Sequence, residues 1–435
     1  MDYGQILSKY HYAELRIERS ADSLVSIKDE EVKHSSGFSE GVSVRVLENG
    51  SWGFASSNNL NDIEMLLQKA HKLAALNSGK IKLKLPPQEK KESGDRGKAT
   101  DGEGQIKELL EAGKLMKAQS ITSRTISSTD STLKKEFYNS QGSEIIEERL
   151  YTYVSCTAIA KSEGLIQRGS ERAWSRSGFG KINLQEIAEE AKNKAIRLLT
   201  AGPPPKGRFT VVLDPEMTGV FSHEAVGHAC EADSVVDRES ILAGKLGKKI
   251  GNELVTIVDD PTANDFGGYR YDDEGVEARP ATLIDKGILK TFMNSMETAQ
   301  ELGLELNGHT RAGEYSEVPI IRMSNTYFQK GDSTLNDVFD VRDGVYLKGM
   351  RGGSVDIFSG GFMFKAEEAY EIKNGEKQKI MRDVTISGNI LQTMLDVECV
   401  GNDFGTSPGI CGKMGQEAPV SDGGPHIRIK NVAIG

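Results

Sequence analysis

FSHEAVGHACEAD, residues 221–233, carries two of the seven histidines in the chain, and Glu224 directly follows the first of them. Metal-binding helices commonly place two histidines at i and i+4, about 40° apart on an ideal helix, with a glutamate after the first as general base. His223 and His228 are five residues apart, so a regular helix would set them about 140° apart. If both bind one metal ion, the helix must absorb an extra residue, as a π-bulge does. Gly227 permits such a distortion, and we expect an irregular helix there.

A catalytic zinc takes three protein ligands and leaves the fourth position to water, so this pair needs a third donor. The alternative is a helix whose two histidines are buried and hydrogen-bonded without a metal. SPGICGKMGQ (407–416) is predicted to be a loop rich in turn-forming residues, where the thiolate of Cys411 would be accessible, and Glu231 follows the second histidine by one turn. Spacing favours Cys411 and then Glu231, and it leaves open Cys399, Cys230, Asp233, His309 and His426.

Glycine is unevenly distributed around this segment. Of the 47 glycines in the 435 residues, 29 lie in residues 208–435. Thr200–Arg208, TAGPPPKGR, contains three consecutive prolines, which can neither continue a helix nor donate to a sheet. We therefore expect a domain over residues 1–200, a linker over 201–207 and a second domain over 208–435. Short apolar strands broken by glycine predict that this C-terminal domain is a mostly-β sandwich or barrel-like fold that carries the metal-site helix.

Residues 1–200 are predicted to form a mixed α/β domain with sheets and helices, so the chain as a whole is of the α+β class. Alternating valines precede Asn49-Gly50, which is a strong hairpin signal. Helical spacing follows over residues 61–77, 106–119 and 184–199. Residues 86–105 contain almost no apolar side chains and are predicted to be a mobile loop. Strands followed by a helix recur, which indicates a weak internal duplication or an ordinary α+β alternation.

Composition argues against several other classes of protein. A net charge of −10 disfavours a nucleic-acid partner. No apolar run approaches the roughly 18 residues of a membrane span, and the first residues do not look like a secretory signal. The four scattered cysteines favour a reducing compartment. We therefore expect a cytoplasmic protein with neither nucleic acid nor membrane as partner.

Five blocks of this sequence, taken together, resemble those of a known family, the TldD/PmbA (modulator of DNA gyrase) metallopeptidases. They are HEAVGHACEAD (223–233), YRYDDEGVEARPATLIDKGILKTFM (269–293), PIIRMSNTY (319–327), GGSVDIFSGGFMFKAEEAY (352–370) and GICGKMGQEAPV (409–420). The resemblance covers essentially the whole chain. Because the HExxxH motif is present, the chain is similar to the catalytic, TldD-like branch.

This resemblance implies a zinc peptidase with a defined set of site residues. His223, His228 and Cys411 would bind Zn²⁺, and Glu224 would act as the general base. The implied substrate is an unfolded or linear peptide. The implied assembly is a homodimer, or a heterodimer with a homologous subunit that lacks HExxxH.

Residue chemistry suggests further members of such a site. The tetrahedral oxyanion needs a donor besides the metal, and Arg311 in GHTRAGEY is the candidate, although a solvated loop arginine would look the same. Asp272, Asp273 and Glu274 could orient the histidines as hydrogen-bond acceptors, or they could form a turn before Gly275.

The paired glycines 352-353 and 360-361 are candidates for a substrate groove. Gly352, Gly353, Gly360 and Gly361 would let an extended peptide approach a sheet edge, unless they only form tight turns. Two other functions remain open, a regulatory or non-catalytic subunit of a TldD/PmbA-type complex and a zinc amidohydrolase for small substrates. An open cleft along a sheet edge would favour peptides, and a sealed pocket would favour small amides.

Overall fold

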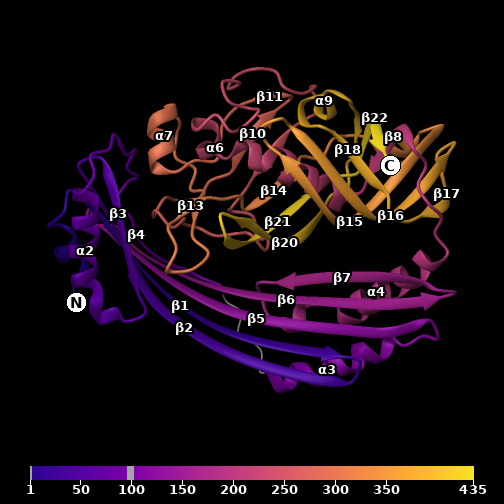
Figure 1. Cartoon of the computed structure of the whole chain (residues 1–435), viewed down its shortest axis with the longest axis horizontal. Helices are drawn as coiled ribbons and strands as arrows, with labels where there is room; N and C mark the ends of the chain where they lie inside the picture. The colour runs from indigo at the N-terminus through magenta and orange to yellow at the C-terminus, as the bar shows by residue number, and fades with distance from the viewer. Residues whose placement is uncertain (1, 96–101) are drawn as a thin grey trace.

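One long, curved sheet forms the N-terminal half of the protein (Figure 1). The computed structural model describes residues 2–95 and 102–435. Its strand order is β3-β2-β1-β5-β6, with β7 also paired to β6. Neighbouring strands along this order are antiparallel, and β4 adds to β6 in parallel. The strands are β1 (Tyr12–Lys28), β2 (Glu31–Glu48), β3 (Ser51–Ser57), β4 (Lys90–Gly94), β5 (Ile121–Asn139), β6 (Glu144–Ser162) and β7 (Leu165–Ser175).

The order helix, three strands, helix occurs twice in this half, as the sequence pattern suggested. α1 (Tyr3–Leu7) and α2 (Ile63–Ala75) flank β1–β3, and α3 (Gly102–Leu115) and α4 (Leu184–Leu199) flank β5–β7. The short 3₁₀ turns Leu60–Asp62 and Phe179–Lys181 precede α2 and α4. Leu67 of α2 lies in one apolar core and Ala191 of α4 in a second core, to which Val25 and Ile27 of β1 also contribute.

Two local predictions for this half have different outcomes. The Asn49-Gly50 hairpin is confirmed, because both residues have positive φ, 51° and 69°, between β2 and β3. The mobile loop predicted for residues 86–105 is wrong in part. Lys90–Gly94 form β4 because their backbone pairs in parallel with Glu144–Glu148, which needs no apolar side chains, and α3 begins at Gly102. Residues 96–101 of that predicted loop lie outside the described residues.

A five-stranded barrel is the centre of the C-terminal half and confirms the predicted barrel-like fold. β8, β22, β18, β16 and β15 pair in this order, and β15 closes the ring by pairing with β8. β17 and β19 extend it at β16 and β22. The strands are β8 (Gly207–Leu213), β15 (Asp343–Asp356), β16 (Gly361–Lys373), β17 (Glu376–Met381), β18 (Thr385–Asn389), β19 (Val397–Val400) and β22 (Ile427–Ile434).

A second sheet packs beside the barrel, in the order β11-β10-β9-β14-β21-β20, and β12 and β13 form a separate pair. One apolar core joins both sheets and includes Phe221 and Val226 of the HExxxH segment. The strands are β9 (Ile257–Asp259), β10 (Ala281–Asp285), β11 (Ile288–Leu289), β12 (Thr310–Arg311), β13 (Ile320–Ile321), β14 (Asn325–Phe328), β20 (Gly405–Lys413) and β21 (Gln416–Gly424). The α-helices are α5 (Pro215–Val220), α6 (Ala232–Val236), α7 (Met296–Leu302), α8 (Leu335–Phe339) and α9 (Ile390–Leu395).

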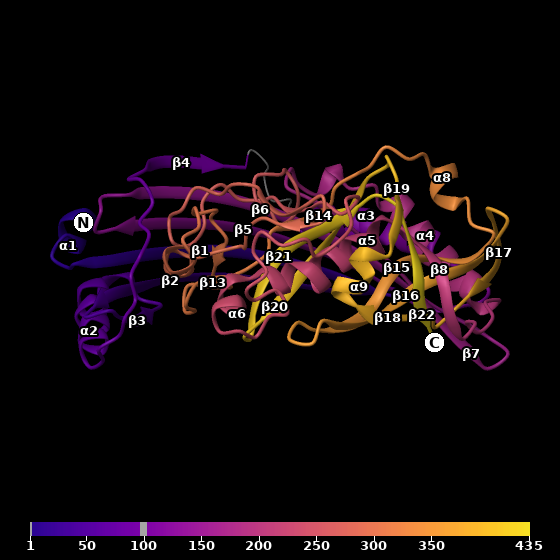
Figure 2. The same ribbon diagram turned by 90° about the horizontal axis from the view of Figure 1, so that it is seen from above.

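The C-terminal half lies over the concave side of the N-terminal sheet (Figures 1 and 2). Residues 203–206 connect α4 to β8 without regular secondary structure. Ion pairs join the halves at both ends of the contact, including Lys194 with Glu367 and Arg45 with Glu274. Within the described ranges, no helix is long and apolar enough to cross a membrane. The arrangement sets β7, an outer strand of the first sheet, against the HExxxH side of the second half.

Candidate metal centre

The segment that carries both histidines is a helix with an extra residue in its turn. α5 begins behind the N-cap Asp214 and continues as a π-helical turn over Phe221–Gly227 and a 3₁₀ turn over His228–Cys230. The wider turn brings His223 and His228 to the same side, with ring centroids 5.3 Å apart. The irregular helix expected from the five-residue spacing is confirmed.

Gly227 is needed here for space rather than for an unusual backbone conformation. Its φ of −55° is one that any residue adopts. A Cβ at this position would overlap Sδ of the fully buried Met323. The absence of a side chain therefore lets the π turn lie close against the strand segment that leads into β14.

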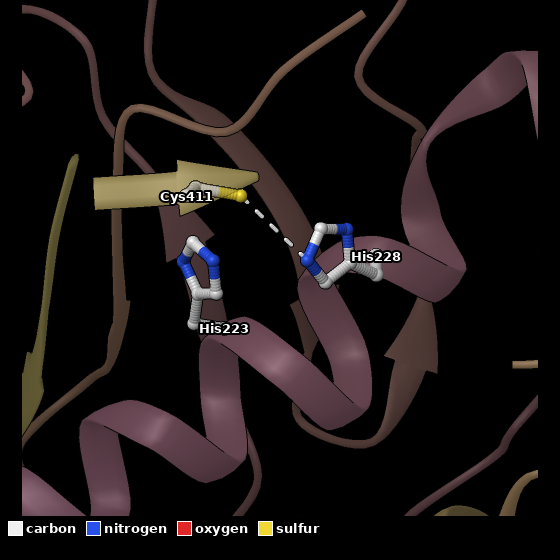
Figure 3. Close-up of side chains that lie close together, drawn as sticks. All are labelled: His223, His228 and Cys411. Carbon is white, nitrogen blue, oxygen red and sulfur yellow. Dashed lines mark hydrogen bonds between the residues drawn. The ribbon is translucent and has the colours of Figure 1, made fainter. Parts of the chain in front are cut away.

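Cys411 faces the two histidines from β20. The prediction of a loop over residues 407–416 is wrong for residues 407–413, because Gly405–Lys413 pair along their length with Gln416–Gly424 of β21. Cys411 Sγ lies 3.7 Å from His228 Nε2, and the ligand atoms of His223, His228 and Cys411 all lie within 4.8 Å of one another. Both imidazole rings point toward the thiol (Figure 3). The other candidate ligands do not join this cluster: His309 contacts Asp259, His426 contacts Asp403, and Asp233 contacts Lys413.

Electrostatics at this cluster favour a thiolate. Burial alone would raise the pKa of Cys411, but hydrogen bonds from His223 and His228 and their positive charge lower it to about 5. Burial alone would lower the pKa of His228, but Glu231 and Cys411 raise it to about 10. Two imidazoles and one thiolate are the donors that zinc binds in proteins. The residues present therefore fit a zinc ion with three protein ligands.

Glu231 and Lys413 support the histidine on one side of the cluster. Glu231 Oε2 lies 3.0 Å from His228 Nδ1, and Lys413 Nζ lies 3.3 Å from the same oxygen. This hydrogen bond leaves Nε2 of His228 free to bind a metal. Glu231, predicted as the second choice for the third ligand, therefore supports His228 instead, and no sequence pattern pointed to Lys413. The sequence signal for this contact was a carboxylate three residues after His228, because residues i and i+3 are neighbours on a helix.

The cluster opens into a cavity of about 560 Å³ between the two halves of the protein. One wall is β7, which contributes Arg168, Ser170 and Arg172, and the opposite wall includes Gly409–Gly412 of β20. Glu224 also lines the cavity, with its side chain 39% exposed and its Oε2 3.7 Å from His228 Nε2. A carboxylate thus lies beside the candidate metal ligands and in reach of a bound substrate.

Arg311 is not brought to this cavity. Its guanidinium is buried, donates to the carbonyl oxygens of Met323 and Pro419 at 2.9 and 2.8 Å, and lies 5.0 Å from the ring centroid of Tyr269. It ties the segment before β14 to β21. The structure therefore gives Arg311 a packing role in place of the predicted contact with the oxyanion.

Asp272, Asp273 and Glu274 lie at the contact between the two halves and do not touch the histidines. Glu274 pairs with Arg45 at 2.9 Å, Asp273 pairs with Lys135 at 2.9 Å, and Asp272 accepts three backbone N–H groups. The predicted support of the histidines is wrong for these three residues, because cations of β2 and β5 bind two of the carboxylates and a tight turn binds the third.

The two glycine pairs proposed for a substrate groove separate in the structure. Gly352 and Gly353 of β15 line the cavity. Gly360 and Gly361 lie at the turn between β15 and β16, where Gly360 has a φ of 77°, and neither lines the cavity. Only the first pair is in a position to contact a substrate.

Two imidazoles, a thiolate and a glutamate around one cavity have the composition of a metal-dependent hydrolase centre. Three family models match the chain, for PmbA/TldA metallopeptidase domain 1 (residues 13–74), the central domain (84–199) and the C-terminal domain (206–435). The chain therefore belongs to the PmbA/TldA metallopeptidase family.

Curated relatives match over nearly the full chain. A metalloprotease of Methanothermobacter thermautotrophicus is 41% identical, over 100% of this chain and 98% of the relative. A zinc metalloprotease TldD homolog of Saccharolobus solfataricus is 32% identical, over 98% and 96%. Among solved structures, TldE from Thermococcus kodakarensis has the same fold, with a TM-score of 0.79, 21% identity and coverage of 99% and 98%. The names of the two curated relatives support a metallopeptidase.

Proposed function

We propose that this protein is a zinc-dependent peptidase of the HExxxH type that cleaves unfolded or linear peptides. His223, His228 and Cys411 would hold the zinc. The observation that carries this proposal is the convergence of their donor atoms within 4.8 Å at a cavity of about 560 Å³. A zinc ion bound there would polarise the scissile carbonyl and lower the pKa of a water molecule toward neutrality.

Glu224 is the group that moves protons. Its carboxylate projects into the cavity beside His228. From this position it accepts a proton from the attacking water and donates it to the leaving amine. Its partly exposed side chain is free to turn between these two sites.

Two outer strands make the cavity suitable for an extended peptide. In the described chain, β20 pairs with β21 and β7 pairs with β6, so each has its second edge free of strand pairing. Both strands contribute residues to the cavity wall. An extended segment binds such an edge through main-chain hydrogen bonds, whatever its side chains. Gly352 on the third wall leaves room for its backbone, because a Cβ there would point into open space. A folded domain would not fit between the walls.

The two alternative functions find less support. A non-catalytic subunit would need no convergent donors, yet both histidines, the glutamate and the cysteine are assembled here. A small-molecule amidohydrolase would need a small closed pocket, whereas this cavity lies between two sheet edges that belong to different halves of the protein.

Metal content and peptide cleavage together test the proposal. The protein is expected to bind about one zinc per chain and to cleave an unstructured, fluorogenic peptide. His223→Ala and Cys411→Ala should lose both zinc and cleavage, and Glu224→Ala should lose cleavage alone. Glu64→Gln is a control, because Glu64 is exposed on α2 and does not line the cavity. Normal zinc binding and cleavage by Cys411→Ala would show that the third ligand is wrong.

The assembly and the compartment remain part of this proposal. We expect a homodimer, or a heterodimer with a homologous subunit without HExxxH, and light scattering of the purified protein together with co-purification from its host distinguishes the two. A cytoplasmic location agrees with the four cysteines, which are all free thiols in the structure.

A further inference from the structure

The two candidate histidine ligands differ in what their second ring nitrogen contacts. His228 Nδ1 is hydrogen-bonded to Glu231. His223 Nδ1 is buried and has no hydrogen-bond partner in the part of the chain that the structure describes. In Figure 3 the other nitrogen of this ring faces Cys411, so Nδ1 is the atom that must carry the proton when the ring binds a metal.

Asp422 of β21 has an acceptor oxygen that likewise lacks a partner. It lines the cavity, and its Oδ1 is buried without a hydrogen-bond partner among the described residues. A Cβ built at Gly219 would lie 2.6 Å from this oxygen, so the carboxylate rests directly on α5. Gly219 precedes His223 by four residues, which places it about one turn earlier on the same side of the helix.

An unpaired buried donor and an unpaired buried acceptor are each costly, because neither recovers the hydrogen bonds that it would make to water. Burial raises the pKa of Asp422 to about 7, and the charge of His223 opposes this rise. Arg172 also lowers this pKa, and Glu216 and Glu224 raise it. Two of these groups, the imidazole at Nδ1 and Arg172 at Nε, are buried donors without a hydrogen-bond partner among the described residues, but the Asp422 carboxylate rests on the helix that carries the imidazole.

We propose that Asp422 is a positioning residue that accepts a hydrogen bond from His223 Nδ1 and so directs Nε2 toward the metal. Asp422 would then serve His223 as Glu231 serves His228, and each histidine ligand would have its own carboxylate. This inference rests on the proposed zinc site, but it concerns the orientation of a ligand and not the peptidase reaction.

Zinc affinity, measured by competition with a chromogenic chelator, tests this role without any substrate. Asp422→Ala is expected to weaken zinc binding by about 10- to 100-fold, as loss of such supporting contacts typically does. Asp422→Asn keeps an acceptor oxygen and should restore most of that affinity. Cobalt-loaded protein gives a second readout, because the visible spectrum of Co²⁺ should change in Asp422→Ala when His223 is no longer held in place.

Two further variants calibrate the experiment. Glu231→Gln should lower zinc affinity to a similar extent, and Glu367→Gln, in the same cavity, should leave it unchanged. Unchanged zinc affinity and an unchanged cobalt spectrum in Asp422→Ala would overturn the inference. If KM alone rises in this variant, Asp422 contacts the substrate instead, and the inference is overturned as well. A failure of the unchanged protein to bind zinc would contradict the proposed function itself, so the two failures are distinguishable.

Discussion

Two buried clusters of charged and polar side chains, the metal cluster and the interdomain cluster, have opposite chemistry. The metal cluster consists of His223, His228 and Cys411, whose donor atoms face one another without a lysine or arginine among them. The interdomain cluster contains Asp273 and Glu274 of the C-terminal half, together with Glu14 and the cations Arg16, Arg45 and Lys135 of the N-terminal sheet.

The difference between the two clusters distinguishes a site placed for chemistry from a contact that holds the fold together. In the interdomain cluster each carboxylate has a cation, so the charges are compensated and hold two halves of the molecule together. In the metal cluster the three donors converge on one point beside a cavity, so their lone pairs are placed to bind a cation from outside the chain. Burial of charge alone, which both clusters share, therefore does not identify a functional site.

The largest expected effect concerns turnover and should occur in the metal cluster alone. Glu224→Gln should lower kcat by about 10²- to 10⁴-fold, the usual contribution of general acid–base catalysis, while zinc content stays constant. Asp273→Asn should leave the kcat of the folded protein unchanged. Steady-state kinetics with zinc determined on the same samples measures both, and a comparable loss of kcat in Asp273→Asn would break the distinction.

A second large effect should occur in the interdomain cluster alone. Arg45→Met leaves the buried carboxylates of Glu14 and Glu274 without their shared partner, which typically costs about 3–5 kcal/mol of unfolding free energy. Chemical denaturation measures this loss. Lys33→Met is the control, because its pair with Glu31 is exposed and should have no measurable effect. Loss of zinc in folded Arg45→Met protein would show that the two clusters depend on each other.

A smaller effect is expected where the metal cluster depends on the π turn. Gly227→Ala forces a methyl group against Met323, and such overpacking typically costs about 1–3 kcal/mol. Zinc affinity should fall together with the midpoint of thermal unfolding. Met323→Ala in the same chain should restore part of both by making room, and a chain with Gly227→Ala that behaves as the unchanged protein would disprove the steric argument.

The smallest effect expected is a difference between cysteines. With its pKa of about 5, Cys411 is a thiolate at neutral pH, whereas burial raises the pKa of Cys230 and Cys156. In zinc-free protein at pH 7, iodoacetamide should therefore modify Cys411 at least about tenfold faster than the other two. The rate should fall only as the pH drops through about 5, and zinc should protect Cys411. Peptide mass spectrometry over time measures each rate.

Sequence predicted the local part of the site better than its surroundings. The five-residue spacing of His223 and His228 required an irregular helix, because helix geometry permits no other way to bring them together. Of the carboxylates that support the histidines, Glu231 had a local signal three residues after His228, but Asp422 had none. Asp272 to Glu274 form a dense acidic run but belong to another contact, and Asp422 gives no signal in its own segment because its neighbour His223 comes from a distant part of the chain.

The fold shows the same division between local and distant information. Hairpins, helix spacing and the glycine-rich β character of residues 208–435 were predictable, because each depends on short segments of sequence. Closure of the barrel was predictable only as a class, because the pairing of β8 with both β15 and β22 joins strands more than a hundred residues apart in sequence. Strand β4 was missed because its pairing uses the backbone of residues that are otherwise typical of a loop.

The distance along the chain between the ligands has a consequence for biosynthesis. Cys411 is 183 residues beyond His228, so a ribosome has translated most of the C-terminal half before the third ligand exists. A nascent or truncated chain that ends before β20 holds the histidines and Glu224 but lacks the thiolate and one wall of the cavity. Under the proposed function, proteolytic competence therefore arises only when the chain is nearly finished, and unfinished products cannot attack other nascent chains around them.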